Sequence, residues 1–204
     1  MKEILFVTSS ALGEHSGSRR IGLALVEAAQ KANDGLRLHT RDVTGIPHVS
    51  LDGLSALRTD PKNHTPAQAA AVAFADGVIE EVERASLIVI AAPMYTFTIP
   101  STLKAWIEHL NRPGRAFRQT EHGAEGLLTG KKVVVVATRG SVFAKDDPMN
   151  FQENYLAAVL GFFGMKDIDL IVAEGTAHEG GKDALRAAEE RATRIGAKLA
   201  LELE

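Results

Sequence analysis

The chain has 204 residues and a formal net charge of -3, with 45% hydrophobic and 24% charged residues, which is ordinary for one globular domain. This balance argues against nucleic acid or a membrane surface as partner, because both attract basic proteins. No apolar run reaches the roughly 18 residues of a membrane helix, and the N-terminus carries no signal-peptide pattern. The chain contains no cysteine, which excludes disulfides and thiolate chemistry. We therefore expect a cytoplasmic protein.

Apolar runs alternate with helical patterns along the chain, which predicts a doubly wound parallel α/β sheet of five strands. We expect the strands over residues 3–8, 36–42, 87–91, 133–136 and 168–173. We expect the helices from about Ser18, from Thr65-Pro66, from Pro100, over 151–163 and over 183–201. Right-handed crossovers would place these helices on both faces of the sheet. Residues 43–64 are expected to form a long irregular connection, and residues 112–130 a second long connection.

The loop after the first predicted strand is rich in serine and ends at a predicted helix. Its small polar residues are Ser9, Ser10, Ser16, Gly17 and Ser18. Serine hydroxyls and free N–H groups at a helix N-terminus bind anions without lysine, and glycine permits close backbone approach or a positive φ. The patterns G-x-x-x-x-G-K-[ST] and G-x-G-x-x-G are absent, which favours a monophosphate ligand. The alternative is that Ser16 or Ser18 only caps the helix.

Two further loops follow apolar strands. Met94, Tyr95 and Phe97 lie within five residues and would form an apolar wall for a flat ring, with Thr96 at the ring edge. Residues 138–141 read Thr-Arg-Gly-Ser, a turn with one cation and two hydroxyls. Alternatively, the aromatic side chains pack beneath the next helix and the last loop is an ordinary polar turn. Because parallel strands end at one sheet edge, we predict that the three loops hold one ligand together.

Residues for several other chemistries are missing. No G-x-S-x-G pattern is present, which disfavours a hydrolase with a nucleophile elbow. The seven histidines show neither H-x-x-x-H nor H-E-x-x-H spacing, so we expect no metal site. A chain without an evident acid, base or nucleophile fits chemistry that a bound cofactor performs.

Seven sequence blocks occur in the order found in one enzyme family. They are S-S-x5-S-x-S at 9–18, A-P-M-Y-x-F-x-I-P-S-T-L-K at 92–104, F-R-x-T-E at 117–121, G-L-L-T-G-K-K at 126–132, T-R-G at 138–140, G-F-x-G-M at 161–165 and A-E-G at 173–175. With them the chain resembles the FMN-dependent NADH:quinone oxidoreductases, or azoreductases, of the flavodoxin-like fold. The resemblance implies a homodimer that passes hydride from NADH or NADPH through bound FMN to quinones and azo compounds.

The resemblance also implies roles for individual residues. The FMN phosphate would be held by Ser10, Ser16, Gly17 and Ser18. The isoalloxazine ring would be lined by Met94, Tyr95, Thr96 and Phe97, and its other edge closed by Thr138, Arg139, Gly140 and Ser141. Arg139 is also a candidate for electrostatic support of the flavin, and Phe117 and Phe162 are expected to be substrate-binding ring walls. No residue is expected to bind a metal.

Two positions depart from the family pattern, which usually has asparagine at Thr96 and often tyrosine at Gln119. The first departure affects one hydrogen bond to the flavin edge, and the second affects substrate stacking. The segment 112–128 would reach the active site of the partner subunit; the alternative is a surface hairpin.

The favoured hypothesis is a reaction in two steps. The nicotinamide stacks on the flavin, delivers its hydride and leaves, and the quinone or azo compound then takes its place. The protein would position the rings and stabilise charge on the reduced flavin with loop amides. Two alternatives are a flavodoxin-type electron carrier without small-molecule turnover, and a regulatory or scaffold module without flavin. Such carriers tend to be strongly acidic, unlike a chain of net charge -3.

Overall fold

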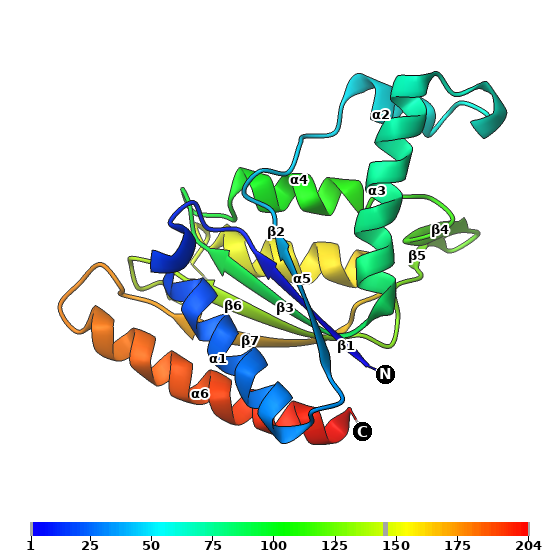
Figure 1. Ribbon diagram of the computed structural model, residues 1–204. Helices are drawn as coiled ribbons and strands as arrows, with labels where there is room; N and C mark the ends of the chain where they lie inside the picture. The colour runs from blue at the N-terminus through cyan, green and yellow to red at the C-terminus, as the bar shows by residue number, and fades with distance from the viewer. Residues whose placement is uncertain (1, 145–146, 204) are drawn as a thin grey trace.

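One parallel sheet of five strands organises the protein, whose computed structural model describes residues 2–144 and 147–203. The strands are β1 (Glu3–Thr8), β2 (Arg37–Asp42), β3 (Ala85–Pro93), β6 (Lys132–Thr138) and β7 (Asp167–Ala173). Their spatial order is β2-β1-β3-β6-β7, so the winding direction reverses between β1 and β3 (Figure 1). The predicted doubly wound sheet is confirmed.

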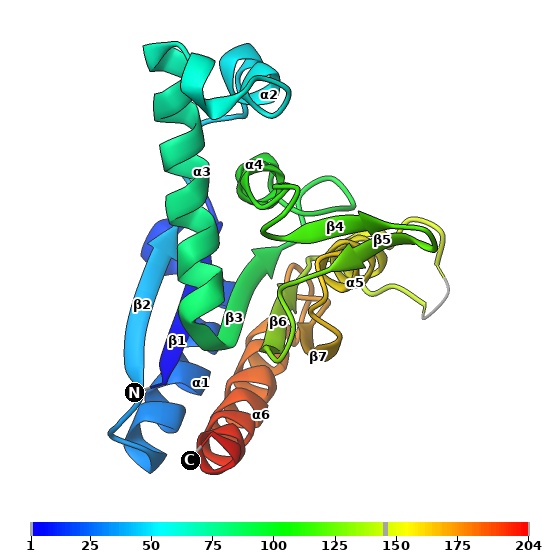
Figure 2. The same ribbon diagram turned by 90° about the vertical axis from the view of Figure 1, so that its right-hand side faces the viewer.

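Helices cover both faces of the sheet, as expected. On one face lie α1 (Gly17–Ala32) and α6 (Gly181–Glu202), and on the other lie α3 (Pro66–Arg84), α4 (Ser101–His109) and α5 (Phe151–Phe162) (Figures 1 and 2). Side chains alternate between the faces along each strand. In β3, Leu87 and Val89 join the core beneath α1 and α6, while Ile88 and Ile90 join the core beneath the other three helices. This double burial explains the continuous apolar runs in the sequence.

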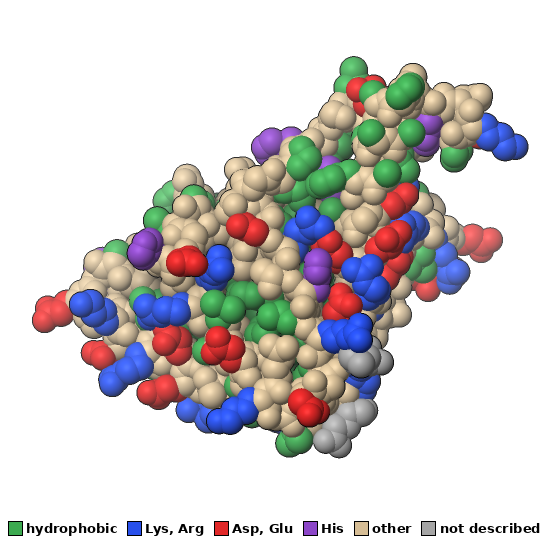
Figure 3. All heavy atoms as spheres, viewed as in Figure 1, with side chains coloured by type: hydrophobic (Ala, Val, Ile, Leu, Met, Phe, Trp, Pro, Cys, Tyr) green, Lys and Arg blue, Asp and Glu red, His purple; other side chains and the backbone are tan. Residues whose placement is uncertain are grey.

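Residues 43–64 are not wholly irregular, and that expectation was wrong. They contain the short helix α2 (Leu51–Ala56) and a 3-10 turn at Pro61–Asn63. Next, α3 begins as predicted at Thr65-Pro66, with a capping box between Thr65 and Gln68. Figure 2 shows α2 beside the first turns of α3, beyond the end of the sheet. Hydrophobic side chains gather on the surface there (Figure 3), and Leu51, Leu54 and Leu57 of this region are exposed.

Residues 112–130 contain a hairpin, the element that was named as the alternative for segment 112–128. Strands β4 (Phe117–Thr120) and β5 (Gly123–Gly126) form an antiparallel hairpin apart from the main sheet (Figure 2). An ion pair of 2.7 Å joins Arg118 to Glu125 across the hairpin, and this hydrogen bond lowers the pKa of the Glu125 carboxyl. Among the helices of the described residues, none is long and apolar enough to cross a membrane.

Candidate functional site

The three predicted loops leave the same edge of the sheet. In the β1–β3 ladder Thr8 pairs with Ala91, and in the β3–β6 ladder Pro93 pairs with Thr138, so all three strands end at one level. Two hydrogen bonds bind the loop starts together: Ser9 Oγ donates to the carbonyl of Ala91 at 2.8 Å, and Met94 N–H donates to the carbonyl of Thr138 at 2.7 Å. The sequence prediction that these strand ends meet is confirmed.

The first loop forms an anion cradle at the N-terminus of α1. Ser16 is the N-cap and its Oγ accepts a hydrogen bond from the N–H of Arg19, so the helix-cap interpretation is correct for this residue. Ser16 and Ser18 are both buried, and their hydroxyls lie 3.0 Å apart. The N–H groups of Gly17 and Ser18 donate to no acceptor among the described residues. Free N–H groups and hydroxyls at the positive end of a helix dipole are suited to a phosphate.

Of the two reasons that the sequence offered for a glycine at position 17, close approach and a positive φ, the structure excludes the second. Its φ is not positive. A Cβ at this position would lie 2.7 Å from Cδ2 of Leu185, because α1 packs closely against α6 here. The missing side chain therefore makes room for Leu185, while the N–H of Gly17 remains available at the cradle. A side chain introduced at position 17 would require the side chain of Leu185 in α6 to shift.

The second loop is a tight turn with both central residues in the left-handed region. Tyr95 N–H donates to the carbonyl of Thr98 at 2.8 Å, and Thr98 N–H returns a bond of 3.2 Å. The φ angles are 47° at Thr96 and 69° at Phe97. This conformation is strained for a β-branched residue such as Thr96. The N–H groups of Thr96 and Phe97 bond to no other described residue, so the turn presents two donors at the sheet edge.

The two aromatic residues of this turn have different surroundings, and neither is packed wholly beneath the following helix. Phe97 is 43% exposed, so its ring is not packed beneath the following helix and is free to contact a ligand. Tyr95 instead reaches back to the first loop: its hydroxyl accepts from the N–H of Ala11 at 3.1 Å and lies 3.2 Å from Oγ of Ser10. This tyrosine thus fixes the position of the turn relative to the cradle.

The third loop is held by the side chain of Arg139. This residue is only 7% exposed, and its guanidinium donates to Glu174 at 2.8 and 3.0 Å, to Glu153 at 2.5 Å and to Asn150 at 3.1 Å. It also lies over the ring of Phe143. Two carboxylates therefore engage its charge. The N–H groups of Gly140 and Ser141 donate to no described residue and remain available at the edge.

The partners of Arg139 were not found by sequence reasoning. Glu174 lies in the A-E-G block, but nothing in that block signals an ion pair with a residue 35 positions away. Gln152 was missed as well; it is fully buried, and its Nε2 donates to the carbonyl of Ala92 at 2.8 Å, which joins the start of α5 to the end of β3. No group of three or more potential metal ligands occurs within residues 2–144 and 147–203.

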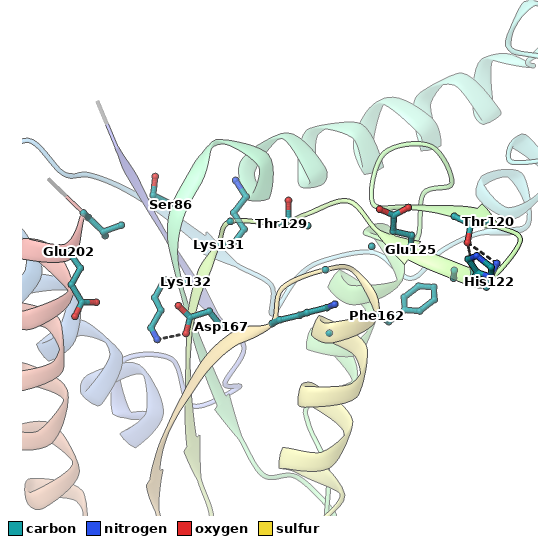
Figure 4. A pocket seen from close by; sticks show the side chains of 18 of the residues that line it. Ser86, Thr120, His122, Glu125, Thr129, Lys131, Lys132, Phe162, Asp167 and Glu202 are labelled. Carbon is teal, nitrogen blue, oxygen red and sulfur yellow. Dashed lines mark hydrogen bonds and ion pairs between the residues drawn. The ribbon is translucent and has the colours of Figure 1, made fainter.

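Phe117 and Phe162 come together, but not with the three loops of the same chain. Their ring centroids lie 5.0 Å apart, between β4 and the last turn of α5. The start of α5 is at the loops, where Glu153 binds Arg139, and its 12 residues span about 18 Å. Phe162 lines a hollow of about 930 Å³ at the opposite, amino-terminal end of the strands, together with Ser86, Lys132 and Asp167 (Figure 4).

A second, smaller hollow of about 470 Å³ lies beside the 95–98 turn. Its lining residues are Tyr95, Thr96, Thr98, Ile99, Ser101, Lys104 and Tyr155. Burial raises the pKa of the Tyr155 phenol, so this group stays protonated at neutral pH. The surface of the hollow is mainly apolar, and the ammonium group of Lys104 lies near it.

Known proteins are similar to this chain in sequence and in fold. The family model described as Flavodoxin-like fold matches residues 2–199. FMN-dependent NADH:quinone oxidoreductase 1 of Xanthomonas axonopodis pv. citri is 43% identical over 177 residues, which cover 86% of each chain. The chain belongs to the FMN-dependent NADH:quinone oxidoreductase family, on the flavodoxin-like fold. FMN-dependent NADH:quinone oxidoreductase 2 of Pseudomonas aeruginosa is 42% identical over 178 residues, covering 86% of this chain and 88% of that one.

A solved structure extends the family likeness to three dimensions. The azoreductase from Bacillus anthracis Sterne is 26% identical, with a TM-score of 0.89 over 97% of this chain and 100% of that one. The segment matched to the family, residues 2–199, includes the three loops and the β4–β5 hairpin. The membership in the FMN-dependent NADH:quinone oxidoreductase family that the sequence blocks indicated is therefore confirmed.

Proposed function

We propose that this protein is an FMN-dependent oxidoreductase that transfers hydride from NADH or NADPH to quinones and azo compounds. One observation carries the proposal: the loops after β1, β3 and β6 present free N–H groups and buried hydroxyls at the same edge of the sheet. The names of the relatives from Xanthomonas and Pseudomonas, each at least 42% identical, support the same activity. They favour an enzyme over an electron carrier or a scaffold.

The residues present fit an FMN phosphate in the cradle. Ser10, Ser16 and Ser18 supply hydroxyls, and Gly17 and Ser18 supply N–H groups without another acceptor in the described chain. At the base of the site the Oγ1 of Thr8 is buried and has no hydrogen-bond partner among the described residues. A ligand with several acceptor oxygens would satisfy these groups, whose burial without partners costs free energy.

The other two loops fit the flavin ring. The side chains of Met94 and Phe97 supply apolar surface, and the N–H groups of Thr96, Phe97, Gly140 and Ser141 supply donors for polar ring atoms. When bound, FMN accepts a hydride from the nicotinamide and passes it to the acceptor. The chain positions the rings and aims fixed N–H dipoles at the place where negative charge develops. Arg139 acts in this proposal by holding its loop in place, since Glu153 and Glu174 already engage its charge.

The protein is further proposed to be a cytoplasmic homodimer, in which Phe117 and Phe162 wall the site of the partner subunit. The loops lie at one end of α5 and this aromatic pair at the other. A two-fold axis across the α4–α5 face would place the loops of each subunit against the aromatic pair of the other, as an isologous interface requires. The hollow beside the 95–98 turn offers space for the incoming pair. Residues 112–128, which carry the hairpin, would then reach across the interface.

A complementation experiment tests whether the aromatic wall acts across subunits. One chain carries Phe162→Ala and the other carries Ser18→Asp, which places a charge against the phosphate; heterodimers are isolated with two different tags. If Phe162 acts in trans, one site of each heterodimer combines intact loops with an intact Phe162, and about half of the wild-type activity returns. If Phe162 acts in cis or plays no part, the heterodimer shows no more than the average activity of the two mutant homodimers.

Steady-state kinetics test the activity itself. With NADH or NADPH and a naphthoquinone, the FMN-loaded protein should turn over many times, with the parallel double-reciprocal lines of a two-step mechanism. The flavin-depleted protein is the control and should be inactive until FMN is added. Flavin binding without turnover would instead favour the electron carrier, and absence of flavin binding would favour the scaffold.

A further inference from the structure

Two glycines bring the hairpin and α5 into direct backbone contact. Gly126 is the last residue of β5, and Gly164 follows the end of α5. A Cβ at Gly126 would lie 2.2 Å from the N atom of Gly164, 2.2 Å from the C atom of Phe163 and 2.5 Å from the carbonyl oxygen of Phe162. All three are backbone atoms, which cannot turn aside as the end of a flexible side chain can.

The requirement at Gly126 is for space and not for an unusual backbone conformation. Its φ is not positive, so any residue could adopt the local backbone. Gly164 has both constraints: its φ is +100°, and a Cβ there would lie 2.9 Å from the C and O atoms of Gly126. Glycine inside a strand weakens the strand, and its presence often marks a close approach of another backbone segment. The contact between Gly126 and Gly164 is named the glycine joint below.

Each segment that meets at the joint carries one ring of the aromatic pair. Gly126 pairs with Phe117 in the β4–β5 ladder, and Phe162 lies two residues before Gly164. One hydrogen bond lies beside the joint: the N–H of Leu128 donates to the carbonyl of Phe163 at 2.9 Å. The separation of 5.0 Å between the two ring centroids therefore depends on how closely the hairpin backbone sits on the end of α5.

We propose that the glycine joint is a positioning element that sets the Phe117–Phe162 pair and thereby the fit of the electron acceptor. This inference rests on the proposed function, in which the pair forms the outer wall of the neighbouring subunit's site. A side chain at position 126 pushes the hairpin away from α5 and separates the rings, whose mutual attraction depends on distance and angle. The FMN loops lie at the other end of α5 and are not disturbed.

The test compares Gly126→Ala with a matched glycine variant on α5. Gly161→Ala is the control, because a Cβ at Gly161 meets nothing within 4 Å. For Gly126→Ala we expect the KM for a naphthoquinone to rise about tenfold, as misplacement of a contact by a fraction of an ångström can cause. The kcat, the affinity for FMN and the rate with ferricyanide, which needs no stacking wall, should stay at wild-type values. Gly161→Ala should match wild type in every measurement.

A second pair of variants separates positioning from general damage. On a Phe117→Ala/Phe162→Ala background, Gly126→Ala should raise the KM no further, because both rings through which the joint acts are already absent. Gly164→Ala approaches the joint from the other side and should reproduce the selective rise in KM. This variant also serves if Gly126→Ala does not fold.

Several results would overturn the inference. A wild-type KM in Gly126→Ala would do so, as would a full effect of Gly126→Ala on the Phe117→Ala/Phe162→Ala background. Failure of both glycine variants to fold would also overturn it, because the joint would then be a requirement of the fold and not of acceptor binding. These results leave the proposed function intact. A wild-type protein that binds FMN but reduces no quinone would overturn both.

Discussion

The hydroxyl groups of Ser10 and Tyr95 lie 3.2 Å apart, although 85 residues separate them in the chain. The same tyrosine hydroxyl accepts the N–H of Ala11 at 3.1 Å. These bonds connect the phosphate cradle after β1 with the left-handed turn after β3. The distance between the place for a phosphate and the place for a ring is thereby set before any ligand arrives, and such preorganisation strengthens binding.

Tyr95→Phe should therefore weaken FMN binding while the fold is retained. The substitution removes a hydrogen bond of about 1 kcal/mol and loosens the loops that this bond holds. We therefore expect the affinity for FMN to fall about five- to tenfold. Fluorescence titration of the apoprotein with FMN measures this. Tyr155→Phe is the control, since no hydrogen bond joins its hydroxyl to another described residue; equal losses in both variants would contradict the role given to Tyr95.

Ser18→Ala should lower the affinity for FMN without lowering the stability of the apoprotein. The Ser18 hydroxyl contacts only that of Ser16 in the described chain, so it is free to donate to a phosphate. A bond to a charged group contributes about 1.5–3 kcal/mol, which corresponds to a loss in affinity of at least about tenfold. Ser16→Ala should lower both quantities, since it also removes the helix cap, at a cost of about 1 kcal/mol. Titration with riboflavin, which lacks the phosphate, should show no effect of Ser18→Ala.

Thr96→Asn should stabilise the protein. Asparagine tolerates the left-handed region better than a β-branched residue, and Thr96 has a φ of 47°. Relief of about 1 kcal/mol of strain would raise the Tm by about 2–4 °C for a chain of this size. Thr98→Asn is the control, because Thr98 does not have a positive φ. A lower Tm for Thr96→Asn, or an equal gain in both variants, would show that the turn is not strained at Thr96.

Arg139→Met should destabilise the fold strongly. The substitution removes the cation that Glu153 and Glu174 share, and these side chains are 26% and 34% exposed. Removing one partner of a buried ion pair costs about 3–5 kcal/mol, and we expect the lower end of that range because both carboxylates reach solvent. Arg186→Met is the comparison: its ion pair with Asp183 is exposed, so the expected change is below about 1 kcal/mol. Chemical denaturation of the apoprotein measures both. Unchanged stability together with an altered flavin potential would favour the direct electrostatic role first expected for Arg139.

The sequence was sufficient to predict the main sheet, because burial on both faces leaves unbroken apolar runs such as Val133–Val136. It did not predict α2, and it offered a hairpin at 112–128 only as an alternative, without the bounds of β4 and β5. Helix α2 has six residues with Gly53 in its middle, and each hairpin strand has four residues of mixed polarity. Elements this short depend on tertiary contacts, which local patterns do not encode.

The candidate site was predictable in its location but not in its internal contacts. Strand ends identified all three loops, since parallel strands share an edge. The partners of Arg139 could not be read, because Glu153 and Glu174 are 14 and 35 positions away. Close approach at Gly17 was likewise foreseeable, but its neighbour was not, because Leu185 lies on a helix far along the chain.

Absorbance spectroscopy under anaerobic conditions tests the central claim most directly. The account predicts that the purified chain, loaded with one FMN per subunit, loses its flavin absorbance on addition of one equivalent of NADH and regains it on addition of one equivalent of quinone. A protein that takes up no FMN, or one whose bound flavin is not bleached by NADH or NADPH, would contradict it.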